Sequence, residues 1–214
     1  MPENVSRGKR VRCSKCGSAF YDLGRKRAAC PNCNRADLIT NGTIAEVSLQ
    51  LIGGGHNDAR QGWTDGWVTQ NAKGAAYLNC EFTVTVGSFA TRKFRDLIGL
   101  YTPKGAWWGN KGRRTIRDIL NSANNLRDDD YSPTALSARC LGSLGDLNDL
   151  IFIAEIGVGR GPSGMEKNEL KAVLTPEDER FISTQRSNTS ALGAQNSLLG
   201  IRKSNAQPVW MSKV

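Results

Sequence analysis

Two Cys-x-x-Cys pairs near the N-terminus constrain the fold of this chain more than any other feature. Cys13 and Cys16 form the first pair, Cys30 and Cys33 form the second, and a short basic segment separates them. This spacing can bring four thiolates to one tetrahedral Zn²⁺ ion, and four cysteine ligands leave no open position for catalysis. The segment has too few apolar side chains to fold without such a staple. We therefore expect a zinc ribbon with one structural Zn²⁺.

Two other uses of these cysteines have to be weighed against zinc. They could form two disulfides, or one pair could be a redox motif of the thioredoxin type. A thioredoxin-type motif lies in a βαβ pattern, which the surrounding sequence does not have. Reduced zinc-binding cysteines, together with Cys80 and Cys140 as buried free thiols, are typical of the cytoplasm.

The rest of the chain predicts a small β-rich body. Residues 43–51 and 75–86 alternate between apolar and polar side chains, which is the period of a strand with one buried face. Apolar residues at helical spacing follow the third strand. The order of elements is three strands, a helical insert and two strands, which is the plan of a five-stranded OB-fold barrel with the insert between strands 3 and 4. The expected strands are 43–51, 75–86, 91–101, 150–158 and 169–174, and the expected helices are 115–126 and 132–144.

The chain as a whole is thus expected to be mainly β (α+β) and to have four parts. Residues 1–9 are expected to be disordered, 10–38 to form the zinc ribbon, 41–180 the OB-fold domain, and 181–214 a flexible basic tail. The sequence contains no long apolar run and no secretory leader pattern, so we expect no membrane association.

The charge distribution favours a polyanionic partner. The net charge is +9, and residues 1–40 carry nine Lys and Arg against three acids, while residues 181–214 carry four against none. A basic ribbon and a basic tail around a nearly neutral body are typical of nucleic-acid binding, although charge also serves solubility.

A catalytic site is not indicated. His56 is the only histidine and lies in a glycine-rich loop without a nucleophile motif beside it. The glycines at 53–55 are not followed by the Lys and Ser/Thr of a phosphate-binding loop. We therefore expect a protein that is not an enzyme.

Cations interleaved with aromatic rings provide the strongest functional signal. Rings can stack on bases and cations can contact phosphates, which are the two ingredients of single-strand binding. Some of the tryptophans are expected to plug the barrel instead, including one of Trp107 and Trp108. The residues concerned lie in the loop after strand 1, in strands 2 and 3, and in the loop after strand 3: Arg60, Trp63, Trp67, Tyr77, Arg92, Lys93, Arg95, Lys104, Trp107, Trp108, Lys111, Arg113 and Arg114.

Two resemblances support this interpretation. Residues 77–82, 92–94, 117–123 and 147–152 make the body similar to phage and prophage single-stranded-DNA-binding proteins of the OB-fold type. That resemblance implies sequence-nonspecific coating of single strands in phage or mobile-element replication or recombination. Such proteins often end in an acidic tail that recruits replication or recombination proteins, whereas this tail contains no acid.

The ribbon has a resemblance of its own. Phe20, Tyr21, Asp22 and Leu23 precede the second cysteine pair, and the segment resembles the zinc ribbon of small bacterial proteins named for an FYDLN motif, with Gly24 in place of the Asn. This similarity favours zinc and leaves the function open.

The sequence therefore predicts a zinc-ribbon and OB-fold protein whose partner is single-stranded DNA, with RNA as a possible substitute. The alternative is an adaptor whose ribbon binds a transcription, replication or ribosomal machine. A third interpretation is that the protein binds duplex DNA, or RNA alone. The oligomeric state is left open.

Overall fold

The computed structural model describes residues 9–12, 19–22, 38–161 and 164–181. These residues fall into two compact units, which divide between Ile39 and Thr40. The predicted zinc ligands Cys13, Cys16, Cys30 and Cys33 lie outside the described residues, as do most of the predicted disordered start and all but the first residue of the predicted tail.

The first unit contains one hairpin. Strand β1 (Lys9–Arg12) pairs antiparallel with β2 (Ala19–Asp22), with Arg12 opposite Ala19 and Lys9 opposite Asp22. The first cysteine pair therefore falls, in sequence, between two strands that pair with each other.

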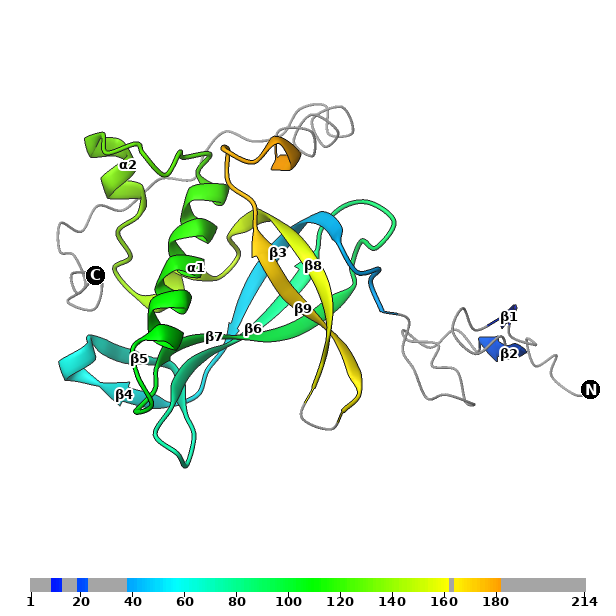
Figure 1. Ribbon diagram of the computed structural model, residues 1–214, viewed down its shortest axis with the longest axis horizontal. Helices are drawn as coiled ribbons and strands as arrows, with labels where there is room; N and C mark the ends of the chain where they lie inside the picture. The colour runs from blue at the N-terminus through cyan, green and yellow to red at the C-terminus, as the bar shows by residue number, and fades with distance from the viewer. Residues whose placement is uncertain (1–8, 13–18, 23–37, 162–163, 182–214) are drawn as a thin grey trace, which may run out of the picture. The chain divides into compact units, whose positions relative to one another are not determined.

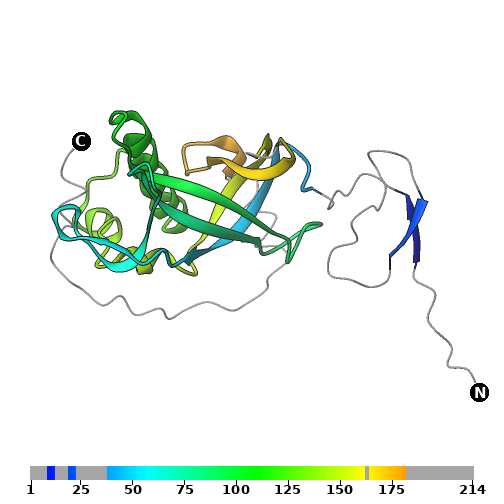
Figure 2. The same cartoon turned by 90° about the horizontal axis from the view of Figure 1, so that it is seen from below.

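The second unit is mainly β, with few helices (Figure 1). Its seven described strands form one antiparallel sheet that curls into a half-barrel (Figure 2). The strands are β3 (Thr43–Ile52), β4 (His56–Asp58), β5 (Trp63–Gln70), β6 (Ala76–Val84), β7 (Lys93–Tyr101), β8 (Ile151–Arg160) and β9 (Glu166–Val173). The helices are α1 (Trp107–Ala123) and α2 (Pro133–Ala138), with short 3₁₀ turns η1 (Ala59–Gln61) and η2 (Leu144–Leu147).

Strand β3 lies in the middle of the sheet and pairs with strands that are far apart in the chain. One edge of β3 pairs with β6 and the other with β8. Strand β6 also pairs with β7 along its length and with β5 near its start, while β9 pairs with β8. The order along the sheet is β4-β5-β6-β3-β8-β9, with β7 beside β6.

The alternation predicted for the first two long strands is confirmed. In β6, every second residue from Ala76 to Val84 is buried, and the residues between them are partly exposed. In β3 the buried side chains include Val47 and Leu49. Phe82 stacks on Phe94 with ring centroids 5.1 Å apart, which joins β6 to β7 inside the core.

Cys80 is buried, as expected from its place in this alternation. Burial among apolar side chains, with a smaller contribution from the nearby Asp96 carboxylate, raises the pKa of its thiol to about 12. The thiol therefore stays protonated and behaves as a core residue.

One side chain, Asp96, connects strands β7 and β9, which do not pair through their backbones in the described part of the chain. No ladder joins β7 to β9 among the described residues. Instead Asp96 of β7 accepts a hydrogen bond from the Leu170 backbone N–H and another from Lys167 Nζ, both at 3.0 Å. These bonds connect the two strands across the open side of the half-barrel.

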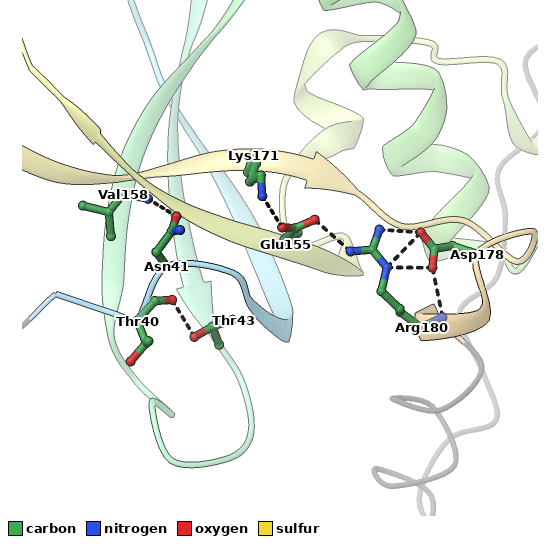
Figure 3. Close-up of polar contacts among 8 residues, drawn as sticks. All are labelled: Thr40, Asn41, Thr43, Glu155, Val158, Lys171, Asp178 and Arg180. Atoms are coloured by element: carbon green, nitrogen blue, oxygen red, sulfur yellow. Dashed lines mark hydrogen bonds and ion pairs between the residues drawn. The ribbon is translucent and has the colours of Figure 1, made fainter.

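A polar network holds residues 178–180, which follow β9, against β8 and β9 (Figure 3). Glu155 is buried and accepts hydrogen bonds from Lys171 at 2.6 Å and from Arg180 at 3.0 Å. Arg180 also donates to Asp178. The pairing lowers the pKa of Glu155, chiefly through the bond from Lys171. This network holds Phe181, which is 1% exposed, in a cluster with Ile153 and Leu174.

The structure corrects three element predictions. The sheet contains two further strands, β4 and β5, in the stretch expected to be a loop. Helix α1 begins at Trp107 and ends at Ala123, so it starts eight residues earlier than residue 115 and ends before 126. Helix α2 has the predicted N-cap, Ser132, but ends at Ala138 instead of near residue 144.

The described helices include none that is long and apolar enough to cross a membrane.

Candidate nucleic-acid interface

The first turns of α1 carry, on their exposed face, a stripe of one aromatic ring and two cations. Trp107, Lys111 and Arg114 follow one another at i, i+4 and i+7, so they share one face of the helix. Trp107 is 74% exposed, and both cations are exposed as well. The Lys111 Nζ atom lies 5.8 Å from the centroid of the Trp107 ring. We call these three residues the α1 stripe.

The opposite face of α1 explains why the stripe points outward. Gly109 and Gly112 are buried against strand β7, and a Cβ at either position would collide with the backbone of Leu100 or Gly99. Only glycine permits so close an approach of helix and strand. The tertiary contact therefore favours helix in a glycine-rich stretch whose intrinsic propensity is low.

Trp108 packs against the sheet instead of facing solvent. Its indole lies where a side chain at Gly99 would be, and its ring centroid is 6.3 Å from that of Tyr77 on the neighbouring strand. Trp108 is only partly buried, and Trp107 is the exposed member of the pair. Trp108 thus has a packing role, on the face of the sheet that carries Tyr77.

The outward face of β6 and β7 carries other predicted binding residues, but part of its charge is neutralised. Lys93 and Arg95 both form ion pairs with Glu81, at 2.7 and 2.9 Å. The bonds from Lys93 and then Arg95 lower the pKa of Glu81, so the carboxylate stays charged. The three side chains together contribute one positive charge.

Sequence reasoning missed two exposed residues on this face. Leu97 is 49% exposed and Tyr101 is 45% exposed. Both continue the alternation begun by Lys93 and Arg95, so that alternation could have placed them outward. Tyr101 adds a second exposed aromatic ring near the start of α1.

Two further predicted cations lie next to the ends of β7. The Arg92 guanidinium lies over the Phe89 ring, 5.4 Å from its centroid, in the turn before the strand. Lys104 is exposed in the short turn between β7 and α1.

The two tryptophans after the first strand belong to strand β5 and not to a loop. Trp63 is 3% exposed and lies 6.3 Å from the His56 ring in an edge arrangement. We assign Trp63 to the core, which corrects its place among the predicted stacking residues. Trp67 is partly buried, with its indole close to Gly145 of η2.

The β4–β5 hairpin is fixed to the body by a carboxylate. Asp65 Oδ2 accepts hydrogen bonds from the Ser143 hydroxyl and from the Leu144 backbone N–H, both at 2.8 Å. Asn57 Oδ1 accepts a bond from the Gly66 N–H across the hairpin. These bonds hold the hairpin and the η1 turn, with Arg60, in a defined position.

The η1 turn and helix α1 together form a pocket of about 380 Å³. It lies between the turn that carries Arg60 and the first turns of α1, where Arg113 reaches it. Two predicted cations that are far apart in the sequence thus line one cavity. Tyr101, Gly105, Ala106 and Gly109 also line the cavity. We call this cavity the Arg60–Arg113 pocket.

A metal site is not found in this part of the molecule: the described residues contain no group of three or more His, Cys, Asp or Glu side chains that could hold an ion.

The comparisons with known proteins bear on the N-terminal unit. A family model described as "Protein of unknown function (FYDLN_acid)" matches residues 2–44. The match confirms the resemblance carried by Phe20, Tyr21 and Asp22, and it covers the first unit and the start of β3. A search of the curated proteins and a search of the solved structures each found no match.

Proposed function

We propose that residues 40–181 form an OB-fold that binds single-stranded DNA without sequence specificity. The order β3, β6, β7, α1, β8, β9 supports this fold, because it repeats the three strands, helix and two strands of that barrel. Pairing of β3 with both β6 and β8 also supports it, because the OB-fold is a partly open Greek-key barrel. The β4–β5 hairpin would then be an insertion between the first two barrel strands.

The observations that carry the function are the α1 stripe and the Arg60–Arg113 pocket, which both involve the first turns of α1. An exposed indole with a cation 5.8 Å from its centre offers a base both a stacking face and a neighbouring positive charge. OB-folds bind oligonucleotides on the face of their second and third strands and in adjacent loops. In this chain the equivalent strands are β6 and β7, and the stripe begins six residues after β7 ends.

We further propose that coating of single strands serves phage or mobile-element DNA replication or recombination. This step rests on the sequence resemblance of the body and on the basic residues at both ends of the chain. The competing adaptor function would use the ribbon as a protein-binding module. The adaptor function makes a different prediction: mutation of the α1 stripe would not weaken binding of the adaptor's protein partner, because the ribbon would bind it.

For the first unit we propose one structural Zn²⁺ held by Cys13, Cys16, Cys30 and Cys33. The β1–β2 hairpin supports this, since a zinc knuckle is a tight turn between short segments and the first pair lies between two paired strands. When bound, the ion would supply folding free energy and no catalysis.

The test of the function is a titration of the full chain, followed by tryptophan fluorescence, with single-stranded DNA, single-stranded RNA and duplex DNA at two salt concentrations. Base stacking on Trp107 should quench fluorescence. We expect single strands to bind more tightly than duplex, with a log–log salt slope of about −0.7 for each phosphate contact. Duplex bound as tightly as single strand, or a flat salt response, would contradict coating.

A further inference from the structure

The Arg60–Arg113 pocket has the chemistry of an anion site. Among the described residues that line it, none is acidic, whereas two are arginines. Neither arginine side chain forms an ion pair within the described part of the chain. The Nε atom of Arg113 is buried and has no hydrogen-bond partner there, while its terminal nitrogen donates to Asn110. A buried guanidinium N–H without an acceptor indicates a ligand that would supply one.

The start of α1 adds to the same positive field. Ala106 caps the helix without a side-chain hydrogen bond, and the first turn contains no acid. The free N–H groups of this turn and the helix dipole therefore favour an anion. Ala106 and Gly109 of this turn line the pocket, together with the two arginines.

We infer that the Arg60–Arg113 pocket binds a phosphate group of the nucleic-acid strand. Guanidinium groups suit phosphate because their planar N–H pairs match its oxygens. The strand would pass between the β4–β5 hairpin and α1, with a phosphate in the pocket and an adjacent base against Trp107. Tyr101, which lines the pocket and is 45% exposed, gives the attached sugar an apolar surface.

This assignment rests on the proposed function only where it concerns a strand, because phosphate binding can be measured alone. The full ¹⁵N-labelled chain is titrated with sodium phosphate, and sodium chloride of the same ionic strength is the reference. We expect saturable shifts of the Gly105 and Gly109 amides with phosphate only. Arg60→Gln with Arg113→Gln should abolish them, and Arg127→Gln, at an exposed arginine outside the pocket, should leave them in place.

A second measurement uses DNA and distinguishes the source of the phosphate. Single-stranded oligonucleotides with a 5′-hydroxyl or a 5′-phosphate are titrated into wild type, Arg60→Gln, Arg113→Gln, Arg113→Lys and Arg127→Gln. We expect each Gln variant in the pocket to weaken binding by about three- to tenfold and to reduce the salt slope by about 0.7. Arg113→Lys should fall between, because it keeps the charge and loses the planar fork. Equal binding of the two oligonucleotides identifies an internal phosphodiester, and tighter binding of the 5′-phosphate identifies a strand end.

The outcomes separate the two proposals. If phosphate gives no saturable shift, or if the pocket variants bind DNA as Arg127→Gln does, the pocket assignment is wrong even where DNA binding holds. If phosphate shifts the glycine amides but single strands do not bind, the proposed function is wrong and the pocket remains an anion site. If Arg113→Gln lowers the melting temperature, Arg60→Gln still tests the pocket, because Arg60 is exposed and its replacement should not disturb packing.

Discussion

A Cβ atom on Gly112 would lie 1.6 Å from the backbone carbonyl oxygen of Gly99, so helix α1 and strand β7 are in direct backbone contact. This contact fixes how α1 is rotated. The face with Gly109 and Gly112 is turned to the sheet, and the α1 stripe is turned to solvent. The proposed interface therefore depends on a residue that has no side chain.

Gly112→Ala should destabilise the second unit, because the helix would have to move away from β7. We expect a loss of about 1–3 kcal/mol, the usual cost of overpacking, measured by urea unfolding. Gly53→Ala is the matched control, since its Cβ would meet only an ordinary contact at 3.7 Å. Equal stability of the two variants would contradict the backbone contact.

Trp107→Ala should weaken binding of single-stranded DNA by about 1–3 kcal/mol and leave the melting temperature unchanged. The ring is exposed, so its loss removes a stacking surface and little packing. Trp63→Ala should do the opposite and cost about 3–5 kcal/mol of stability, because Trp63 is buried. Tyr131→Ala, at an exposed ring on another part of the surface, controls for loss of any aromatic side chain. Normal binding by a well-folded Trp107→Ala would favour the adaptor function.

Asp118→Asn should stabilise the protein above pH 6. The pKa of Asp118 is raised from 3.8 to about 6, chiefly by burial; Arg114 and Arg117 oppose the rise, while Asp128 and Glu177 add to it. A carboxyl whose pKa is higher in the folded than in the unfolded state makes stability fall as pH rises between about 4 and 6. We expect a gain on the order of 2 kcal/mol at pH 7 and a flatter profile over that window, measured by urea unfolding at several pH values. A lower stability of Asp118→Asn than of wild type at pH 7 would show that the folded protein favours the charged Asp118 carboxylate.

Glu155→Gln should destabilise the second unit at neutral pH by about 1–2 kcal/mol, because Lys171 and Arg180 lose a buried anionic partner. The pKa of Glu155 is lowered by folding. Its contribution is therefore present above pH 4.5 and is lost as pH falls through the folded-state pKa. Asp129→Asn breaks an exposed pair with Arg127 and should cost almost nothing. The two unfolding curves should converge in acid, and a constant gap down to pH 2 would argue against an ionic contribution.

Purified protein should contain one zinc ion per chain, bound by the four cysteines of the N-terminal segment. Strong chelation should change the NMR signals of residues 10–38, because the metal supplies their folding free energy. The second unit has its own core and should melt as before. Protein free of metal with unchanged dispersion of those signals would overturn the zinc proposal.

The sequence predicted the strands whose side chains alternate regularly. Residues of β3 and β6 face a core on one side only, so a period of two is visible in the chain itself. The hairpin β4–β5 was missed because β4 has only three residues and the stretch is rich in glycine. Asp65 bonds to Ser143 and Leu144, at the start of η2 and 78 and 79 positions away, and no local sequence pattern predicts such contacts.

The residue types of the candidate interface are visible in the sequence, but their arrangement is not. Trp63 and Trp107 look alike in sequence, since each lies among glycines and polar residues. Trp63 is buried at the start of β5, and Trp107 begins a helix. Arg60 and Arg113 line one pocket only because η1 and α1 converge in the fold, which a linear reading cannot show.

The pairing of β3 with β8 also has a consequence for folding kinetics. Asn41, just before β3, accepts a hydrogen bond from the Val158 N–H, and the two residues are 117 positions apart (Figure 3). Contacts of such sequence separation slow folding, because a long loop has to close before they form. During synthesis β3 can pair with β6 early, but its other edge has no partner until β8 has left the ribosome. An unpaired strand edge is a template for intermolecular pairing, so the nascent chain is most prone to aggregation in that interval.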